Sequence, residues 1–297
     1  MQTIWRVVHI VIGLACGGAL FITNLWAADA VRFAVTDIVG LEGLQREFGA
    51  VRQVLSDATG LAFQFYPVSN RTAAVEALKS RKVDFVLTGP AEYVVFRKRT
   101  DAYPVVGFSR PDYFSTIIGL ADSGISLPAD LKGKKVAFGA IGSTSKHLAP
   151  MQLLKDYGVD PLKDIQPLHI SENVAWEALK RGDIAALGTT YTIYLRLRSK
   201  EKALEPGAFR VIARGPDLPN DVLLAGPHVD KGIMEKVRQA FETHTRELIQ
   251  AILLGEDNQK YAGMKFLTRI DDRDYNYVRA MYATIGYPEY AEFVEAK

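Results

Sequence analysis

The sequence predicts an α/β protein whose mostly parallel sheets carry helices on both faces. Short apolar stretches that read as buried strands alternate with amphipathic helical stretches, a pattern typical of parallel sheets. The alternation restarts after the turn-rich segment 122–128, so we expect two such units with a cleft between them. The 297 residues, 48% hydrophobic and 24% charged, are enough for two domains of ordinary globular composition.

The first unit alternates regularly from residue 31 to residue 121. The pattern predicts strands at 31–35, 61–66, 83–87, 104–108 and 114–121, and helices at 45–58 and 72–81. Gly60 follows the first helix, and glycine readily adopts the left-handed conformation that ends a helix. The 83–87 stretch is short and mostly apolar, as in a strand buried on both faces.

The second unit repeats the alternation, and the chain then returns to the first. We expect strands at 134–138, 166–170, 184–188 and 209–213, helices after 143 and at 172–181, a return strand at 222–226, and helices at 231–254 and 274–285. The return strand assigns the C-terminal part to the first unit. The predicted division is therefore lobe 1 at 31–121 and 222–297, and lobe 2 at 122–221.

Residues 1–30 are predicted to be a secretory signal peptide. Arg6 precedes a long apolar stretch, and Ala28-Asp29-Ala30 offers a small-x-small cleavage pattern, with a cut after Ala27 or Ala28. A permanent membrane anchor is the alternative, since the stretch is long for a signal peptide. Cys16, the only cysteine, lacks a fitting lipoprotein box, so lipid anchoring is not expected. The mature protein would be periplasmic and free of disulfides and thiolate sites.

Composition and motifs exclude several function classes. The formal net charge of +2 argues against a nucleic-acid-binding surface. The sequence contains no nucleophile elbow, Walker loop, dinucleotide-binding loop or zinc-protease motif. None of the five histidines has metal-ligand spacing, although His169, at the end of a strand, can face the cleft. We therefore predict no enzyme activity, no cofactor and no metal.

The segment 134–145 reads as a buried strand, a small-residue turn and the hydroxyl-rich start of a helix. A helix N-terminus has free backbone N–H groups and a partial positive charge. Gly142 allows close approach, and Ser143, Thr144 and Ser145 add hydroxyl donors, which together form a candidate cradle for an oxyanion. The alternative is that Ser143 only caps the helix.

Two further strand–helix junctions carry polar side chains. Tyr93 follows the 83–87 strand within Gly89-Pro90-Ala91-Glu92-Tyr93, where α/β proteins commonly bind ligands, although packing is its alternative role. Asn70 and Arg71 stand at the equivalent junction after the second strand. Arg71 either clamps an oxyanion with its planar guanidinium or is an ordinary exposed arginine.

These motifs occur together with others in a fixed order. The set comprises 78–85, Gly89-Pro90-Ala91-Glu92-Tyr93, Asp122-Ser123-Gly124-Ile125, 130–138, Gly142-Ser143-Thr144-Ser145 with Pro150, and Arg181-Gly182-Asp183. In order and spacing they resemble the phosphate/phosphite/phosphonate-binding proteins of ABC importers, from about Val31 to Tyr287. The resemblance implies a type II periplasmic binding fold, a monomer whose two lobes close on a ligand, and no catalysis.

The resemblance also implies roles for individual residues. Ser143, Thr144 and Ser145 would hold the oxygens of the ligand, and Tyr93 would hydrogen-bond it from the opposite lobe. Asn70-Arg71 stands where the family commonly has an Asp-Tyr pair. Ala185 and Thr190 stand at two positions that are acidic in the family, which argues against a zwitterionic aminophosphonate. His147 replaces a glycine and either crowds the site or adds a donor.

With Arg71 present and those acids absent, the resemblance implies two ligand classes. One is a fully ionised oxyanion such as phosphate, phosphite or a simple phosphonate, and the other is a small neutral oxyacid such as arsenite. The expected partner is an ABC permease. The alternative is a periplasmic sensing receptor that presents its bound form to a histidine kinase.

Overall fold

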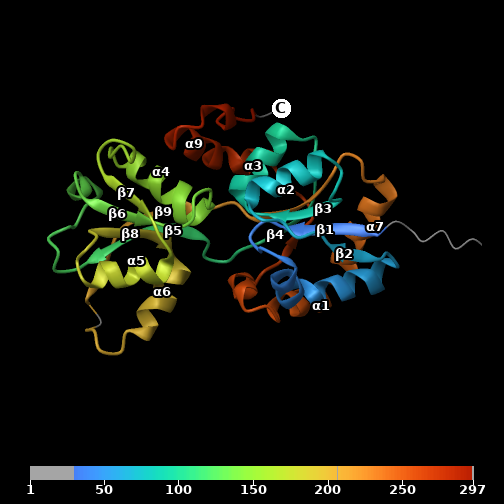
Figure 1. The fold of residues 1–297 in the computed structure, drawn as a ribbon, viewed down its shortest axis with the longest axis horizontal. Coiled ribbons are helices and arrows are strands. Elements are labelled where there is room, and N and C mark those ends of the chain that lie inside the picture. Colours follow the sequence, from blue (N-terminus) through green and yellow to red (C-terminus); the bar gives the residue numbers. More distant parts are fainter. Residues whose placement is uncertain (1–29, 206, 296–297) are drawn as a thin grey trace, which may run out of the picture.

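The computed structural model describes residues 30–205 and 207–295, which fold around two β-sheets (Figure 1). The predicted signal peptide, with Cys16, lies outside the described residues except for Ala30. We call the six-stranded sheet with its helices lobe 1, and the five-stranded sheet with its helices lobe 2. No helix in the described range is long and apolar enough to span a membrane.

Lobe 1 is built on a mixed sheet. Its spatial order is β11 (Phe266–Leu267), β4 (Tyr103–Phe108), β10 (Asp221–Ala225), β3 (Phe85–Thr88), β1 (Val31–Val35) and β2 (Phe63–Phe65). β1 pairs in parallel with β2 and β3, whereas β10 runs antiparallel to β3 and β4. The return strand thus lies in the middle of the sheet, and the carboxyl ends of β1, β2 and β3 share one edge.

Helices cover both faces of this sheet, each over its own apolar core. One core involves α1 (Leu41–Thr59), α7 (Lys231–Thr243) and α8 (Thr245–Leu253). The other involves α2 (Arg71–Lys79), α3 (Pro90–Arg99) and α9 (Asn276–Thr284). Gly60 ends α1 in the left-handed conformation with a φ of 68°, as expected.

The helix predicted at 231–254 is divided into α7 and α8. His244, between them, has φ −109° and ψ 32°, outside the helical range. The hydroxyls of Thr243 and Thr245 donate to the carbonyls of Gln239 and Phe241, at 2.8 and 2.7 Å. Such side-chain bonds compete with the helical ladder, which accounts for a break that apolar periodicity alone did not predict.

Lobe 2 has the same layered design with fewer strands. Its spatial order is β7 (Gln166–His169), β6 (Lys135–Phe138), β8 (Ala186–Thr190), β5 (Phe114–Leu120) and β9 (Phe209–Asp217). Its longer helices are α4 (Ala149–Asp156), α5 (Glu172–Lys180) and α6 (Tyr191–Lys200). Helix α6 was not predicted, because Leu197 is its one fully buried residue and the apolar periodicity is weak. The short helical turns are η1 (Pro128–Leu131), η2 (Thr144–Leu148), η3 (Asp257–Tyr261), η4 (Asp272–Tyr275) and η5 (Pro288–Tyr290).

The first crossing between the lobes lies earlier than the predicted boundary at residue 121. β5 pairs antiparallel with β8 and β9, so it belongs to lobe 2 and the crossing is the segment 109–113. The second crossing, 218–220, lies directly before the predicted boundary at residue 221. Leu218 N donates to Tyr113 O at 2.7 Å, and Arg110 N donates to Asn220 Oδ1 at 3.1 Å. Hydrogen bonds therefore join the two crossings.

Helix α9 contacts both lobes, although its position in the sequence predicted lobe 1 alone (Figure 1). On lobe 1, the Tyr282 hydroxyl donates to the carbonyl of Ala91 in α3 at 3.0 Å. On lobe 2, the Tyr277 hydroxyl donates to Asp156 at 2.7 Å, and the Thr284 hydroxyl donates to Gln152 Oε1 at 2.6 Å, both in α4. The C-terminal helix is thus a third connection between the lobes.

Candidate functional site

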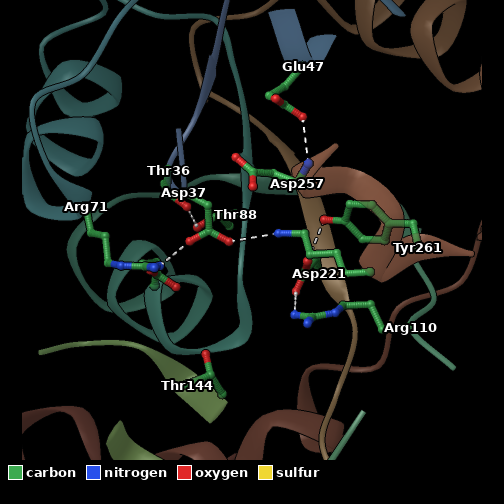
Figure 2. A network of polar contacts seen from close by, with 12 residues as sticks. Thr36, Asp37, Glu47, Arg71, Thr88, Arg110, Thr144, Asp221, Asp257 and Tyr261 are labelled. Carbon is green, nitrogen blue, oxygen red and sulfur yellow. Dashed lines mark hydrogen bonds and ion pairs between the residues drawn. The ribbon is translucent and has the colours of Figure 1, made fainter. Parts of the chain in front are cut away.

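The candidate site lies at the edge of the lobe 1 sheet where parallel strands end. Thr36 follows β1 directly, Thr88 ends β3, and their hydroxyls are 3.2 Å apart. Helices α2 and α3 begin at the same edge because they follow β2 and β3, so Arg71 lies beside these strand ends (Figure 2). In parallel sheets this edge is the usual place for a ligand.

Arg71 is the centre of a charged cluster. Its Nη1 lies 2.5 Å from Asp37 Oδ1 and also forms an ion pair with Glu92 Oε1. Lys260 Nζ lies 3.1 Å from the other oxygen of Asp37. Burial would raise the pKa of the Asp37 carboxyl, but the charges of Lys260 and Arg71 outweigh it and hold the pKa well below its usual value. Arg71 is therefore neither an ordinary exposed arginine nor an unpaired cation.

A second charged group lies next to this cluster, around Asp221 at the start of β10 (Figure 2). The Tyr261 hydroxyl donates to Asp221 Oδ2 at 2.6 Å, and Arg110 Nη1 lies 3.5 Å from Oδ1. Burial and the charge of Asp221 raise the pKa of Tyr261, so it stays a neutral donor. The Arg110 guanidinium also lies 3.5 Å from the centre of the Tyr113 ring, a cation–π contact within the first crossing.

Lobe 2 contributes the hydroxyl-rich turn. Gly142 has φ 86°, a conformation that favours glycine, and a Cβ added there would lie 3.7 Å from Arg71 Cδ. Ser143, Thr144 and Ser145 follow and are each at most 5% exposed. The turn therefore lies directly against the charged wall of lobe 1.

One hydrogen bond joins the two lobes directly at this point. The backbone N–H of Ala91, in the first turn of α3, donates to Thr144 Oγ1 at 2.9 Å. Pro90 precedes Ala91 and has no N–H, so this is the first donor of the helix. Thr144 approaches the charged network from lobe 2 (Figure 2). A lobe 2 hydroxyl thus occupies the N-terminus of a lobe 1 helix.

The two serines of the turn are held differently. Ser143 precedes η2 but its side chain makes no capping hydrogen bond, so the simple capping role is not observed. The carbonyl of Ser145 accepts from the Ser115 hydroxyl at 2.7 Å, which ties the turn to β5. Helix η2 continues into α4, and the first N–H groups of such a helix have no intrahelical acceptor.

The two candidate histidines lie together in lobe 2, with ring centres 4.6 Å apart. His147 Nδ1 accepts from Gly142 N at 3.1 Å, and His169 Nδ1 lies 3.1 Å from the Gly139 carbonyl. Burial, with a smaller contribution from His169, lowers the pKa of His147 to about 4. His147 is therefore a neutral imidazole that braces the Gly142 turn. No cluster of three metal-ligating side chains occurs among residues 30–205 and 207–295.

Two candidate residues have local structural roles instead of joining the charged cluster. Asn70 is the N-cap of α2, and its side chain accepts from Ala73 N at 2.8 Å. Tyr93 is fully buried, with its ring 4.0 Å from that of Tyr275. Burial and the charge of Asp272 raise its pKa. In this conformation Tyr93 packs the α3–α9 core instead of facing the cleft.

Ala185 and Thr190 lie at opposite ends of one strand. Ala185 directly precedes β8, whereas Thr190 is its last residue and caps α6. At about 3.3 Å per residue the two positions are about 16 Å apart, so they do not share one site. Asp37 and Glu92 in lobe 1 are the carboxylates paired with Arg71, and they were not predicted as site residues. Both follow parallel strand ends, and that position was the available signal.

Lys260 and Asp221 were also missed, for a different reason. Lys260 reaches Asp37 from η3, 223 residues further along the chain. Asp221 reaches the cleft because β10 inserts next to β3. Nothing local in the sequence marks either residue, since both positions depend on the return of the chain to lobe 1.

The fold places the chain among the two-lobed type II periplasmic binding proteins. It is similar to PhnD1 from Prochlorococcus marinus in complex with methylphosphonate, with a TM-score of 0.67, 16% identity, and coverage of 87% of this chain and 98% of that one. It is also similar to a binding protein component of an ABC phosphonate transporter from Pseudomonas aeruginosa, with a TM-score of 0.64, 20% identity, and coverage of 85% of each chain. The aliphatic sulphonate binding protein SsuA from Escherichia coli has a TM-score of 0.58 and 18% identity, with coverage of 89% of this chain and 94% of that one.

The sequence defines the family more closely than the fold does. Residues 35–275 match the model of the ABC transporter, phosphonate, periplasmic substrate-binding protein family. The chain belongs to this family, which confirms the resemblance drawn from its motifs. Members are substrate-binding components and not enzymes, and they work outside the cytoplasm with ABC permeases.

Proposed function

We propose that this protein captures a small phosphorus oxyanion, namely phosphate, phosphite or a simple phosphonate, for an ABC importer. The observation that carries the proposal is the hydrogen bond from Ala91 N to Thr144 Oγ1. It brings the serine–threonine–serine turn of lobe 2 to the N-terminus of α3, beside Arg71. Arg71 and the serine–threonine–serine turn are therefore neighbours, which supports an anion site between the lobes.

The donors at this point suit a compact anion. The N-terminus of α3 supplies a backbone N–H and a partial positive charge, and Arg71 supplies a guanidinium. Ser143, Thr144 and Ser145 supply hydroxyls from the other side. A ligand oxyanion would accept the hydrogen bond that Ala91 N now donates to Thr144 Oγ1. The hydroxyls of the turn would then rotate to donate to the ligand. Lobe closure would exclude water and strengthen each hydrogen bond.

The partner of the ligand-bound form is a finer prediction than the family itself. The family supports an ABC permease as partner. The sensing alternative, in which a histidine kinase reads the bound form, stays a prediction. A monomer is also proposed, and light scattering on the purified protein tests it.

The proposal is tested by ligand-induced stabilisation. The purified mature protein is heated with phosphate, phosphite, methylphosphonate, aminoethylphosphonate, sulfate, arsenate or arsenite, and hits are measured by calorimetry. A true ligand at about 100 times its Kd stabilises the fold by about 2.7 kcal/mol and raises the midpoint. We expect a phosphorus oxyanion to do so and aminoethylphosphonate to be weaker. Stabilisation by arsenite alone, or no stabilisation by any phosphorus compound, would overturn the ligand class.

A further inference from the structure

Glu92 has one carboxylate oxygen that no donor satisfies. Its side chain is only 6% exposed, and Oε1 is paired with Arg71. Oε2 is buried and has no hydrogen-bond partner among the residues that the structure describes. A buried acceptor left without a donor is destabilising, because it has lost its hydrogen bonds to water and gained none in return. The site therefore holds an acceptor of negative charge that can gain from a donor on a ligand.

The unsatisfied oxygen faces the point where the lobes meet. A Cβ built on Gly89 would lie 3.1 Å from Glu92 Oε2 and 3.8 Å from both Asp221 Oδ1 and Thr144 Oγ1. Three oxygens from α3, β10 and lobe 2 thus converge on the bare Cα of Gly89. Two of them belong to carboxylates and can only accept when ionised. The Thr144 hydroxyl, already an acceptor for Ala91 N, contributes the one O–H of the three.

The position of Glu92 in its helix explains part of this arrangement. Glutamate in the first turn of a helix interacts favourably with the positive end of the dipole. That interaction accounts for a negative charge at this position. It does not account for a buried Oε2 without a donor, because an exposed rotamer would keep the dipole interaction and hydrate both oxygens. The ion pair with Arg71 holds the side chain inward instead.

We propose that Glu92 Oε2 accepts a hydrogen bond from an acidic O–H of the ligand. The protein then selects oxyanions that keep a proton, such as the monoanion of a phosphonate, and rejects equally shaped anions that have none, such as a sulfonate. This inference rests on the proposed function and refines its ligand class. It also replaces the expectation of a fully ionised ligand. That expectation took Arg71 as a cation available to the ligand, whereas Arg71 is already paired with the carboxylates of Glu92 and Asp37.

The physical basis of this selection is the asymmetry between a made and an unmade hydrogen bond. A P–OH group satisfies Oε2, whereas an ionised oxygen in the same place faces a carboxylate and is repelled. Sites that depend on one hydrogen-bonding group reject analogues without it strongly, because the buried partner stays unpaired. The fold itself does not decide, since the structures similar to this chain include phosphonate-binding and sulphonate-binding proteins.

The test compares methylphosphonate with methanesulfonate, which have nearly the same shape. The methylphosphonate monoanion has one P–OH group, whereas methanesulfonate has no O–H. Affinities are measured by calorimetry for the parent and for Glu92→Gln, at about pH 5.5 and about pH 9, on either side of the second ionisation of a phosphonate. Glu76→Gln is the matched control. Glu76 also pairs with an arginine, Arg99, but its side chain is 53% exposed and lies outside the cleft network.

We expect the parent to prefer methylphosphonate by at least about a hundredfold at the lower pH, equivalent to about 2.7 kcal/mol. Its affinity should fall at least about tenfold at the higher pH. Glu92→Gln should raise the affinity for methanesulfonate, since the amide can donate to a sulfonate oxygen. The preference for methylphosphonate over methanesulfonate should therefore shrink at least about tenfold. Glu76→Gln should behave as the parent.

The outcomes separate the inference from the function on which it rests. Equal binding of both ligands by the parent, or an unchanged preference in Glu92→Gln, overturns the role of Glu92 while leaving oxyanion binding intact. Binding of neither ligand by a folded parent, together with no phosphorus ligand in the thermal panel, overturns the proposed function itself. Thermal midpoints of both variants without ligand show whether a loss of binding reflects unfolding.

Discussion

The two walls of the cleft are made of different chemistry. The lobe 1 wall holds three cations, Arg71, Arg110 and Lys260, against the carboxylates of Asp37, Glu92 and Asp221. The lobe 2 wall presents Ser143, Thr144 and Ser145, supported by the neutral imidazole of His147. Paired charges hold a fixed geometry, whereas hydroxyls can rotate to donate or accept. Under the proposed function, lobe 1 would set which charge state of the ligand fits and lobe 2 would adapt to it.

Loss of Arg71 should have the largest effect on this comparison. Arg71→Ala leaves Glu92 and Asp37 without their shared partner, so the lobe 1 wall becomes net negative. Arg71 is partly buried and Glu92 is buried. Removing one member of a fully buried charge pair costs about 2–5 kcal/mol, so from the lower end of this range we expect affinity for the identified phosphorus ligand to fall about thirtyfold. Calorimetry measures it, with Arg99→Ala on the outer end of α3 as control. A parent-like Kd for Arg71→Ala would show that the charged wall does not bind the ligand.

Removal of lobe 2 hydroxyls should have a smaller effect. Thr144→Val keeps the shape and deletes the group that crosses to Ala91, and Ser143→Ala combined with Thr144→Ala deletes two donors. Each hydrogen bond to a charged group contributes about 1.5–3 kcal/mol, so Thr144→Val should weaken binding by about tenfold or more. Thr116→Val, which removes a buried hydroxyl bonded to Thr189 O, is the control. A double variant within about twofold of the parent would remove lobe 2 from the site.

The neutral imidazole should appear in the pH dependence of stability. The folded-state pKa of His147 is about 4, below its unfolded value of 6.5. The unfolded chain therefore binds more protons between these values, and stability is lost as the pH falls from about 6.5 towards 4. The full cost is on the order of 3 kcal/mol. Urea unfolding at about pH 7 and about pH 4.5 should show a smaller acid-induced loss for His147→Gln than for the parent. Equal losses would mean that His147 titrates normally.

The smallest expected effect concerns the bridge made by α9. Tyr277→Phe removes the hydroxyl bonded to Asp156 across the lobes but keeps the ring. The partly exposed bond should contribute about 1 kcal/mol or less to the free energy of unfolding. Tyr287→Phe, at a half-exposed position, is the control. Urea unfolding measures the difference, and a Tyr277→Phe variant with wild-type stability but altered ligand affinity would sharpen the role of α9 from packing to lobe positioning.

The parts of the molecule that sequence predicted are those encoded locally. The βα alternation, the end of α1 at Gly60 and the turn at Gly142–Ser145 each depend on a few adjacent residues. Arg71 and Thr144 were predicted because both begin helices after strands. The assignment of β5 failed because strand pairing with β8 and β9 is not visible in its own apolar pattern. The burial of Tyr93 depends on α9, which returns from a distant part of the chain.

The position of α9 has a practical consequence for any reporter built on this protein. Any rotation of one lobe against the other must change the contacts of α9 with α3 or with α4, since Tyr282 reaches Ala91 while Tyr277 and Thr284 reach α4. Helix η5, which follows α9 directly, packs against α9 and α3, so residues 288–295 lie on the lobe 1 side of this connection. A fluorescent domain fused there would lie beside a connection between the lobes and would restrain the proposed lobe motion. Labels placed on the outer ends of α5 and α7 would report the motion without restraining it.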